Sequence, residues 1–119
     1  MPRFLSMIRI DESTVPEAGP SIELQQRMGA LLEEITKAGV MLDTAGLTPT
    51  SDGVRVRQDK SGKITVTDGP FTESKEVIGG YAVLQAKDKT EAVEWARRFV
   101  EVHEGEFDIT CEVRQIQEG

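Results

Sequence analysis

Residues 65–76 read TVTDGPFTESKE, and residues 77–81, which follow directly, read VIGGY. A run with strand-like alternation breaks at Asp68-Gly69-Pro70, passes an aromatic residue and a dense polar cluster, and enters an apolar run through two glycines. Neither helical nor strand periodicity explains this stretch, and such a segment usually shapes the backbone or builds a site. The elements around it therefore set the fold into which this stretch must fit.

The N-terminal part of the chain predicts a strand, a helix and a second strand. Residues 3–10 carry apolar side chains on both faces of the strand, which indicates that both faces are covered. After a polar loop, Ser21 is suited to cap a helix whose apolar residues recur at helical spacing up to Gly39, a favoured residue just beyond a helix C-terminus. Residues 40–47 predict the second strand, made irregular by Gly46.

The middle of the chain predicts a β-hairpin and a buried strand. Residues 54–57 and 63–67 alternate with a period of two on either side of a turn-forming sequence at residues 59–62. After residues 65–76, residues 80–86 predict a strand with apolar side chains on both faces. We therefore expect this strand to lie inside the main sheet, with the hairpin inserted before it.

The C-terminal part predicts a second helix and a last strand. Asp88 and Glu91 have the spacing of a capping box at the start of the helix. The helix is expected to end near Gly105, and residues 107–116 alternate as a strand. The residues expected to be buried by this helix are Ala92, Val93, Ala96, Phe99 and Val100.

The order of these elements, β-α-β, hairpin, β-α-β, predicts an α+β fold with a ferredoxin-like layout and an inserted β-hairpin. In such a layout both helices lie on one face of the sheet. Two helices cannot also cover the other face, although its strands carry apolar residues there. An identical sheet from a second copy would supply the cover, so we predict a homodimer whose sheets face each other.

Composition narrows the classes of partner. The length of 119 residues fits one domain over residues 1–119, and a formal net charge of −7 argues against nucleic acid because phosphate binding needs a basic face. We expect a cytoplasmic protein without a membrane partner, because no run has a signal-peptide pattern or membrane-spanning length. The single Cys111 fits a small buried hydrophobe, and no spacing predicts a metal site or a cofactor.

Taken in order, these residues resemble the YCII-related family, in the branch marked by a DGPF motif. The specific part is Asp-Gly-Pro-Phe-x-Glu-x-Lys-Glu over residues 68–76, supported by residues 33–40, 54–57, 79–81 and 91–96. The resemblance implies a dimeric α+β barrel of ferredoxin-like protomers, with a pocket between sheet and helices or near the dimer seam. Some genes of this branch lie beside extracytoplasmic-function sigma factors, which implies a regulatory or stress-linked role.

The candidate site residues come from residues 65–76 and from polar positions on the predicted strands. Asp68 and Glu73 are the candidate catalytic residues, as acid or base groups of a pocket, although Asp68 could instead accept backbone hydrogen bonds in its turn. The candidate ligand-binding residues are Arg9, Arg57, Phe71, Lys75 and Tyr81.

Four of the five ligand-binding candidates also have a structural alternative. Arg9 points at the predicted dimer cavity if it shares the face of Leu5 and Met7, where it holds an anionic ligand or pairs with Asp11 or Glu112. Three further alternatives are that Phe71 anchors its loop, that Tyr81 packs in the core, and that Arg57 forms a solvated rim with Arg55.

The sole histidine, His103, falls on the apolar stripe at the end of the second helix, which favours a packed, hydrogen-bonded side chain. A different branch of the family has a buried His-Asp pair and dehalogenase-like chemistry, and this position does not match that pair.

Three functions remain open from the sequence. The first is a small dimeric ligand-binding or regulatory accessory protein that holds a polar or anionic molecule. The second is an enzyme that acts on a small organic molecule by proton transfer from or to Asp68 or Glu73, with an arginine stabilising negative charge. The third is a protein-interaction module linked to a sigma factor, for which the acidic composition would suit a basic partner.

Overall fold

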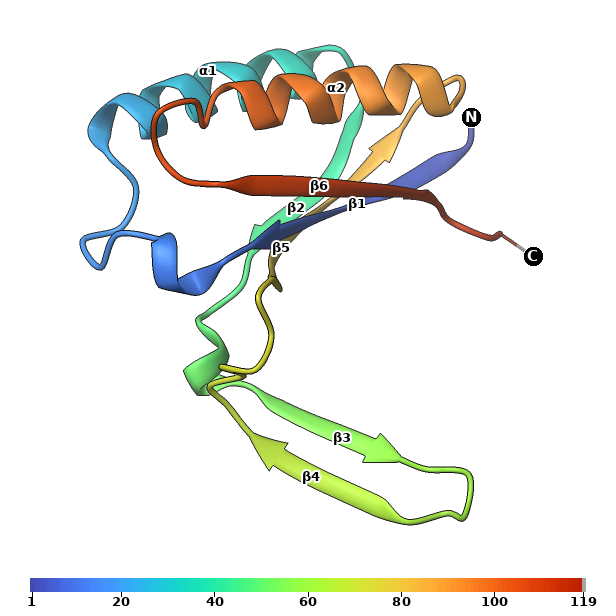
Figure 1. The fold of residues 1–119 in the computed structure, drawn as a ribbon. Coiled ribbons are helices and arrows are strands. Elements are labelled where there is room, and N and C mark those ends of the chain that lie inside the picture. The colour runs from blue at the N-terminus through green and yellow to red at the C-terminus, as the bar shows by residue number, and fades with distance from the viewer. Residues whose placement is uncertain (119) are drawn as a thin grey trace.

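A four-stranded antiparallel sheet carries two helices on one of its faces (Figure 1). The structure, a computed structural model, describes residues 1–118. The strands run in the order β2-β5-β1-β6, which is compatible with the ferredoxin-like layout expected from the sequence. The bounds of these elements are β1 Arg3–Ile10, α1 Ile22–Lys37, β2 Met41–Gly46, β5 Val77–Gln85, α2 Lys89–Glu101 and β6 Ile109–Gln115.

Both helices begin at the residues that the sequence predicts. The Ser21 hydroxyl accepts a hydrogen bond from the Leu24 N–H at 3.0 Å, and the Asp88 carboxylate accepts one from the Glu91 N–H at 2.9 Å. Glu91 in turn accepts from the Lys87 N–H at 3.1 Å, one residue before the position of a standard capping box. Gly39 follows α1 with φ +73°, the left-handed conformation that its lack of a side chain permits.

The core lies between the helices and the sheet. Phe4, Ala86 and Ala92 form its centre, and the fully buried Leu24 packs on the same side of the sheet. The expectation that Val93 is buried is wrong, because this side chain is 45% exposed. The buried residues of α2 are Ala92 and Ala96, and their small side chains let this helix approach the sheet closely.

Strand β5 begins at Val77, three residues before the start predicted at Gly80. The register with β1 shifts at this point, because Ile8 pairs with Gly80 whereas Arg9 pairs with Ile78. Gly79 is the extra residue of this β-bulge, and a Cβ there would lie 2.7 Å from Ile10 Cδ1. The paired glycines therefore continue the strand through a bulge instead of marking its boundary.

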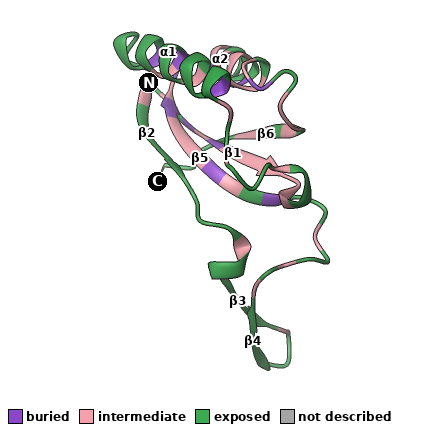
Figure 2. Cartoon of the chain, turned by 90° about the vertical axis from the view of Figure 1, so that its left-hand side faces the viewer, coloured by how far each residue is buried: buried purple, intermediate pink, exposed green. Residues whose placement is uncertain are grey.

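The predicted hairpin is present as a separate two-stranded sheet, made of β3 (Val54–Gln58) and β4 (Ile64–Asp68). We call residues 54–68 the arm. It extends on the side of the sheet opposite the helices, and its strands are exposed along their whole length (Figures 1 and 2). The radius of gyration is 16.1 Å, against about 13.5 Å for a compact chain of this length. The arm therefore stands away from the packed body.

No helix within residues 1–118 has both the length and the apolar content that a membrane crossing requires.

Gly69 and Gly29 make a matched pair of tests for this backbone. The Gly69 N–H donates to Gly53 O at 2.8 Å at the base of the arm, and a Cβ on Gly69 would lie 1.6 Å from Thr50 O. Gly69→Ala is expected to lower the free energy of unfolding by about 1–3 kcal/mol, because the backbone at the base must move. Urea unfolding and amide hydrogen exchange of the arm measure the effect.

Gly29→Ala serves as the control, because Gly29 lies within α1 and a Cβ there meets no atom within 4 Å. It is expected to raise the free energy of unfolding by about 0.5–1 kcal/mol, since alanine loses less backbone entropy in a helix. A Gly69→Ala protein as stable as wild type, with unchanged exchange in the arm, would contradict the close approach of Gly69 to Thr50.

Candidate functional site

The face of the sheet that points away from the helices bears both apolar and charged side chains. We call it the open face. Phe4 and Ser6 of β1 are buried toward the helices, so the alternating Leu5, Met7 and Arg9 lie on the open face. Cross-strand pairing adds neighbours on either side, which are Arg114, Glu112 and Thr110 of β6 and Val83, Tyr81 and Ile78 of β5.

Arg9 lies between two carboxylates on this face. Its Nη1 is 3.1 Å from Glu112 Oε1, and its Nη2 is 3.4 Å from Glu76 Oε1. The Thr110 hydroxyl donates to Glu76 Oε2 at 3.3 Å, which helps to position that carboxylate. The predicted pairing of Arg9 with Glu112 is therefore present, with Glu76 as a second partner in place of Asp11.

A small hydrogen-bond network fixes the base of the arm. Glu12 accepts from both the Thr50 N–H, at 2.8 Å, and the Thr50 hydroxyl. The Thr50 oxygen accepts in turn from the Phe71 N–H at 3.2 Å. Glu12 lies in the short helix Glu12–Thr14 after β1, and Thr50 begins the short helix Thr50–Asp52 before the arm. The network thus joins three loops that are distant in sequence.

The contact between Phe71 and Arg55 joins the arm to residues 69–76, which follow it. The Arg55 guanidinium carbon lies 3.9 Å from the centroid of the Phe71 ring, a cation–π contact. Arg55 also pairs with Glu73 and donates to the Ser74 hydroxyl at 3.0 Å. Hydrogen bonding from its own backbone N–H and from Arg55 lowers the pKa of the Glu73 carboxyl. Glu73 is therefore a weaker base than an ordinary glutamate.

An open cleft of about 500 Å³ lies between the open face and the base of the arm. We call it the arginine cleft. Its cationic lining is Arg9, Arg55 and Arg114, and its anionic lining is Glu76 and Glu112. Met7, Phe71, Val77 and Ile78 supply apolar surface. Guanidinium groups over an apolar floor can bind an organic anion through paired hydrogen bonds.

Among residues 1–118, Arg114 makes no ion pair with a carboxylate, whereas Arg9 and Arg55 each have one or more. Arg114 is exposed on the edge strand β6, in register with Leu5 at the centre of the sheet. A carboxylate or phosphate group entering the cleft would therefore find one guanidinium whose charge no protein carboxylate offsets.

The structure brings only some of the predicted site residues together. Arg9 and Phe71 line the arginine cleft, and Glu73 lies beside it through its contact with Arg55. Asp68 and Arg57 are exposed on the arm and do not line the cleft. These two side chains lie on opposite faces of the arm, by the alternation of its strands.

Tyr81 and Lys75 also lie outside the cleft lining. Tyr81 shares the open face, where its hydroxyl donates to Asp43 Oδ2 at 3.1 Å, and this hydrogen bond with the Asp43 charge raises the pKa of the phenol. Lys75 is exposed, and its charge contributes to lowering the pKa of the Asp11 carboxyl after the larger effect of hydrogen bonds from Ser13.

Sequence reasoning missed Arg114, Glu76 and Thr50 as site residues and placed Arg55 on a rim. The alternation of the last strand does place Glu112 and Arg114 on one face, so a signal for the face was present. The pairing register with β1, which brings Arg114 beside Leu5, could not be derived from that alternation.

A model of the YCII-related domain matches residues 3–116. The chain belongs to the YCII-related domain family. It is also 31% identical over 70 residues to an uncharacterized protein of Rhizobium meliloti. That alignment covers 59% of this chain and 56% of the relative, so the likeness spans little more than half of each protein.

Within residues 1–118 of this YCII-related chain, no group of three or more His, Cys, Asp or Glu side chains is arranged to hold a metal ion. The side chains that line the arginine cleft supply guanidinium groups, carboxylates and apolar contacts.

Thr50 offers a test of the network at the base of the arm. Thr50→Val keeps the shape of the side chain but removes the hydroxyl that joins Glu12 to the Phe71 N–H. The free energy of unfolding is expected to fall by about 1–2 kcal/mol, since two partners lose a hydrogen bond. The Phe71 amide should also exchange faster with solvent, as measured by NMR.

Thr48→Val is the matched control at an exposed threonine of the same loop, and it should change neither quantity. Equal behaviour of the two variants would show that the Thr50 hydroxyl does not fix the base of the arm.

Proposed function

We propose that this chain forms a homodimer that binds a small organic anion in the arginine cleft, as a ligand-binding or regulatory accessory protein. The observation that carries the proposal is Arg114, a cleft guanidinium without a carboxylate partner among residues 1–118. The lining brings three guanidinium groups and two carboxylates together in a chain whose formal net charge is −7. Met7, Phe71 and Ile78 would contact the apolar part of the bound anion.

The open face supports the dimer because it leaves apolar side chains without cover. Leu5, Met7, Tyr81 and Val83 are only partly buried in the single chain, although they lie at the centre of the sheet. In a face-to-face pair, each open face covers the other, which is the self-complementary contact of a twofold dimer. Such a pair would form a dimeric α+β barrel.

The arm supports the same arrangement. Its register places Val54, Val56, Ile64 and Val66 on one face. Val56 is 71% exposed and Val66 is 64% exposed, and a lone two-stranded hairpin is at best marginally stable in water. Arg55, on the opposite face of the arm, lines the cleft of its own chain. The apolar face therefore points away from that cleft, and we propose that it contacts the second copy.

The area that a stable dimer must bury indicates that the proposed interface includes both the arm and the open face. Four aliphatic side chains offer at most about 400 Å² of apolar surface. Each partner of a stable interface buries roughly 800 Å². The arm alone is thus too small to hold a dimer, and the open face would have to supply the rest of the interface.

The other functions stay predictions with less support. Proton transfer by Glu73 is disfavoured by the hydrogen bonds that lower its pKa, and Asp68 lies outside the cleft. A cytoplasmic location and a contact with a sigma factor also stay predictions. Asp68-Gly69-Pro70-Phe71 leads us to propose that the chain belongs to the DGPF branch of the YCII-related family.

Met7→Asp tests the dimer. An added carboxylate at the centre of the open face would lose its hydration in the proposed interface, even beside the arginines of the cleft, so dimerisation should weaken by roughly tenfold or more. Size-exclusion chromatography with light scattering and analytical ultracentrifugation measure the mass as a function of concentration. Far-UV circular dichroism checks that the variant keeps its secondary structure.

The control is Val93→Asp, the same type of change at an exposed position of α2, on the other side of the molecule. This variant should remain a dimer. A monomeric wild-type protein, or a Met7→Asp dimer as tight as wild type, would remove the face-to-face arrangement.

Arg114→Gln tests the ligand. Native mass spectrometry of the purified protein first detects any anion that co-purifies, and calorimetry then measures binding of benzoate as a defined probe. Loss of a charge-assisted contact should weaken benzoate binding about tenfold or more. Arg57→Gln, an arginine outside the cleft, is the matched control and should bind as wild type does. Equal loss in both variants would mean that only general charge attracts the probe.

A further inference from the structure

We propose that the helix side of the sheet holds a second binding site, an apolar cavity in which His103 Nε2 accepts a hydrogen bond from a small neutral molecule with a hydroxyl group. This site lies across the sheet from the arginine cleft and does not depend on the proposed function. The ligand class that it fits is a phenol or an apolar alcohol.

His103 is the only histidine of the chain and is just 6% exposed. It follows the C-terminal end of α2, with its Nδ1 2.9 Å from Phe99 O. The imidazole ring lies between two phenylalanine rings, with centroid distances of 5.0 Å to Phe99 and 5.4 Å to Phe107. These contacts hold the ring in one orientation.

The bond to Phe99 determines which nitrogen carries the proton. A carbonyl oxygen can only accept, so Nδ1 must donate, and Nε2 of the neutral ring is then an acceptor. Burial lowers the pKa of His103, so the neutral form prevails at pH 7. His103 therefore presents a lone pair at Nε2.

No protein group within residues 1–118 makes a hydrogen bond with this lone pair. No fully buried side-chain nitrogen or oxygen in the described part of the chain lacks a partner. Nε2 must therefore border accessible space, even though the side chain as a whole is buried. His103 lines two spaces, an apolar cavity and a charged groove, and in the proposed site Nε2 faces the apolar cavity.

The apolar cavity has a volume of about 300 Å³ and lies between the helices and one end of the sheet. We call it the His103 cavity. Ile8, Met28, Leu32, Phe99 and Phe107 form much of its wall. Thr44 and His103 are the polar side chains of the lining, and the Thr44 hydroxyl already donates to Tyr81 O at 2.9 Å. The Thr44 proton is therefore engaged, and the imidazole Nε2 is the stronger acceptor that the lining offers to a ligand hydroxyl.

The backbone of β5 explains why this space is empty. Gly79 and Gly80 line the cavity and carry no side chain that could fill it. Larger residues would not fit either, because a Cβ on Gly80 would lie 2.9 Å from Ala45 O and 3.3 Å from Ile8 Cδ1. The cavity therefore follows from the close pairing of β5 with its neighbours.

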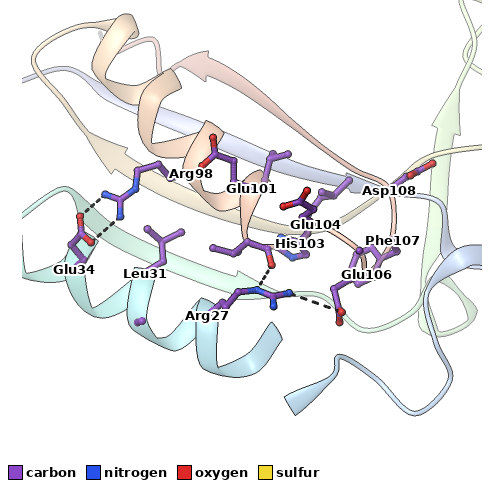
Figure 3. A pocket seen from close by; sticks show the side chains of 15 residues that line it. Arg27, Leu31, Glu34, Arg98, Glu101, His103, Glu104, Glu106, Phe107 and Asp108 are labelled. Carbon is purple, nitrogen blue, oxygen red and sulfur yellow. Dashed lines mark hydrogen bonds and ion pairs between the residues drawn. The ribbon is translucent and has the colours of Figure 1, made fainter. Parts of the chain in front are cut away.

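The charged groove explains why a neutral ligand is favoured. Figure 3 shows His103 and Phe107 at this groove, among charged side chains from both helices and the loop after α2. The charges are largely paired with one another: Arg98 binds Glu34, and Arg27 donates to Val102 O at 2.8 Å and lies 4.0 Å from Glu106. No charged side chain lines the His103 cavity itself, so an ion entering it would lose hydration without a partner.

The size of the cavity also suits a small aromatic molecule. An apolar protein cavity of roughly 150 Å³ is enough to bind benzene. The larger His103 cavity can therefore hold a phenol ring, with its hydroxyl donating to Nε2 and its ring against Phe99, Met28 and Leu32.

The experiment is a titration of the full-length wild-type chain with phenol and, separately, with toluene, followed by NMR. The single histidine makes the imidazole nitrogen signals unambiguous. Phenol is expected to bind about three- to tenfold more tightly than toluene, in line with one hydrogen bond to a neutral group. Phenol, and not toluene, should shift the Nε2 resonance, whereas Nδ1 should change little.

Variants locate the site. Leu32→Trp fills the cavity and should abolish phenol binding, whereas Gln26→Trp, at an exposed position of α1, should not. His103→Phe removes the acceptor and should make phenol bind more weakly than toluene, because the phenol hydroxyl then loses its hydration without a partner. The wild-type titration with the two probes decides the role of Nε2 even if a variant does not fold.

The outcomes also separate this site from the arginine cleft. Saturating benzoate and the Arg114→Gln change should leave phenol binding unaltered. Equal affinity of wild type for phenol and toluene would overturn the role of His103. Absence of saturable binding of either probe, or binding that Leu32→Trp leaves intact, would overturn the site.

Discussion

Two helices cover one face of the four-stranded sheet and leave the other face uncovered, and the other features of the chain depend on this constraint. The covered face holds Phe4, Leu84 and the small helix residues Ala92 and Ala96, which form a dry core. The open face combines the apolar Met7 and Val83 with charged groups. Its composition is therefore intermediate between that of a buried core and that of a solvent-exposed surface. Arm and open face lie on this same side of the molecule (Figure 1).

The base of the arm turns this side of the sheet into a site. The hydrogen bonds that Thr50 donates to Glu12 and accepts from the Phe71 N–H help to hold residues 69–76 against the open face. With them, Phe71 supports the Arg55 guanidinium, and Arg55 reaches the same cleft as Arg9. The polar cluster at residues 71–76 thus acts mainly by positioning an aromatic ring and an arginine. Few of its charged residues enter the cleft themselves.

Local signals in the sequence predicted the elements well because each signal depends on near neighbours. Ser21, Asp88 and Gly39 act within one helical turn, so these three helix ends could be found from composition and spacing. The fourth end differs, because α2 ends at Glu101, one turn before the expected Gly105. The start of β5 was misplaced because a glycine bulge has the same local appearance as a turn. The cleft depends on strand register and on the path of the arm, which are long-range properties. Arg9 and Phe71 were found, whereas Arg114 was not, because only register places it beside Leu5.

Strand β1 is the wall shared by the two sites. Met7 and Arg9 face the arginine cleft, whereas Ile8 and Ile10 face the His103 cavity. The bulge at Gly79 lets β5 follow β1 past Ile10, and the absence of a side chain leaves room there for Ile10, whose Cδ1 would lie 2.7 Å from a Cβ. A shift of one residue in this pairing would move Arg9 toward the apolar cavity and an isoleucine toward the cleft. The glycine pair therefore maintains the separation between a charged site and an apolar one on opposite faces of the same strand.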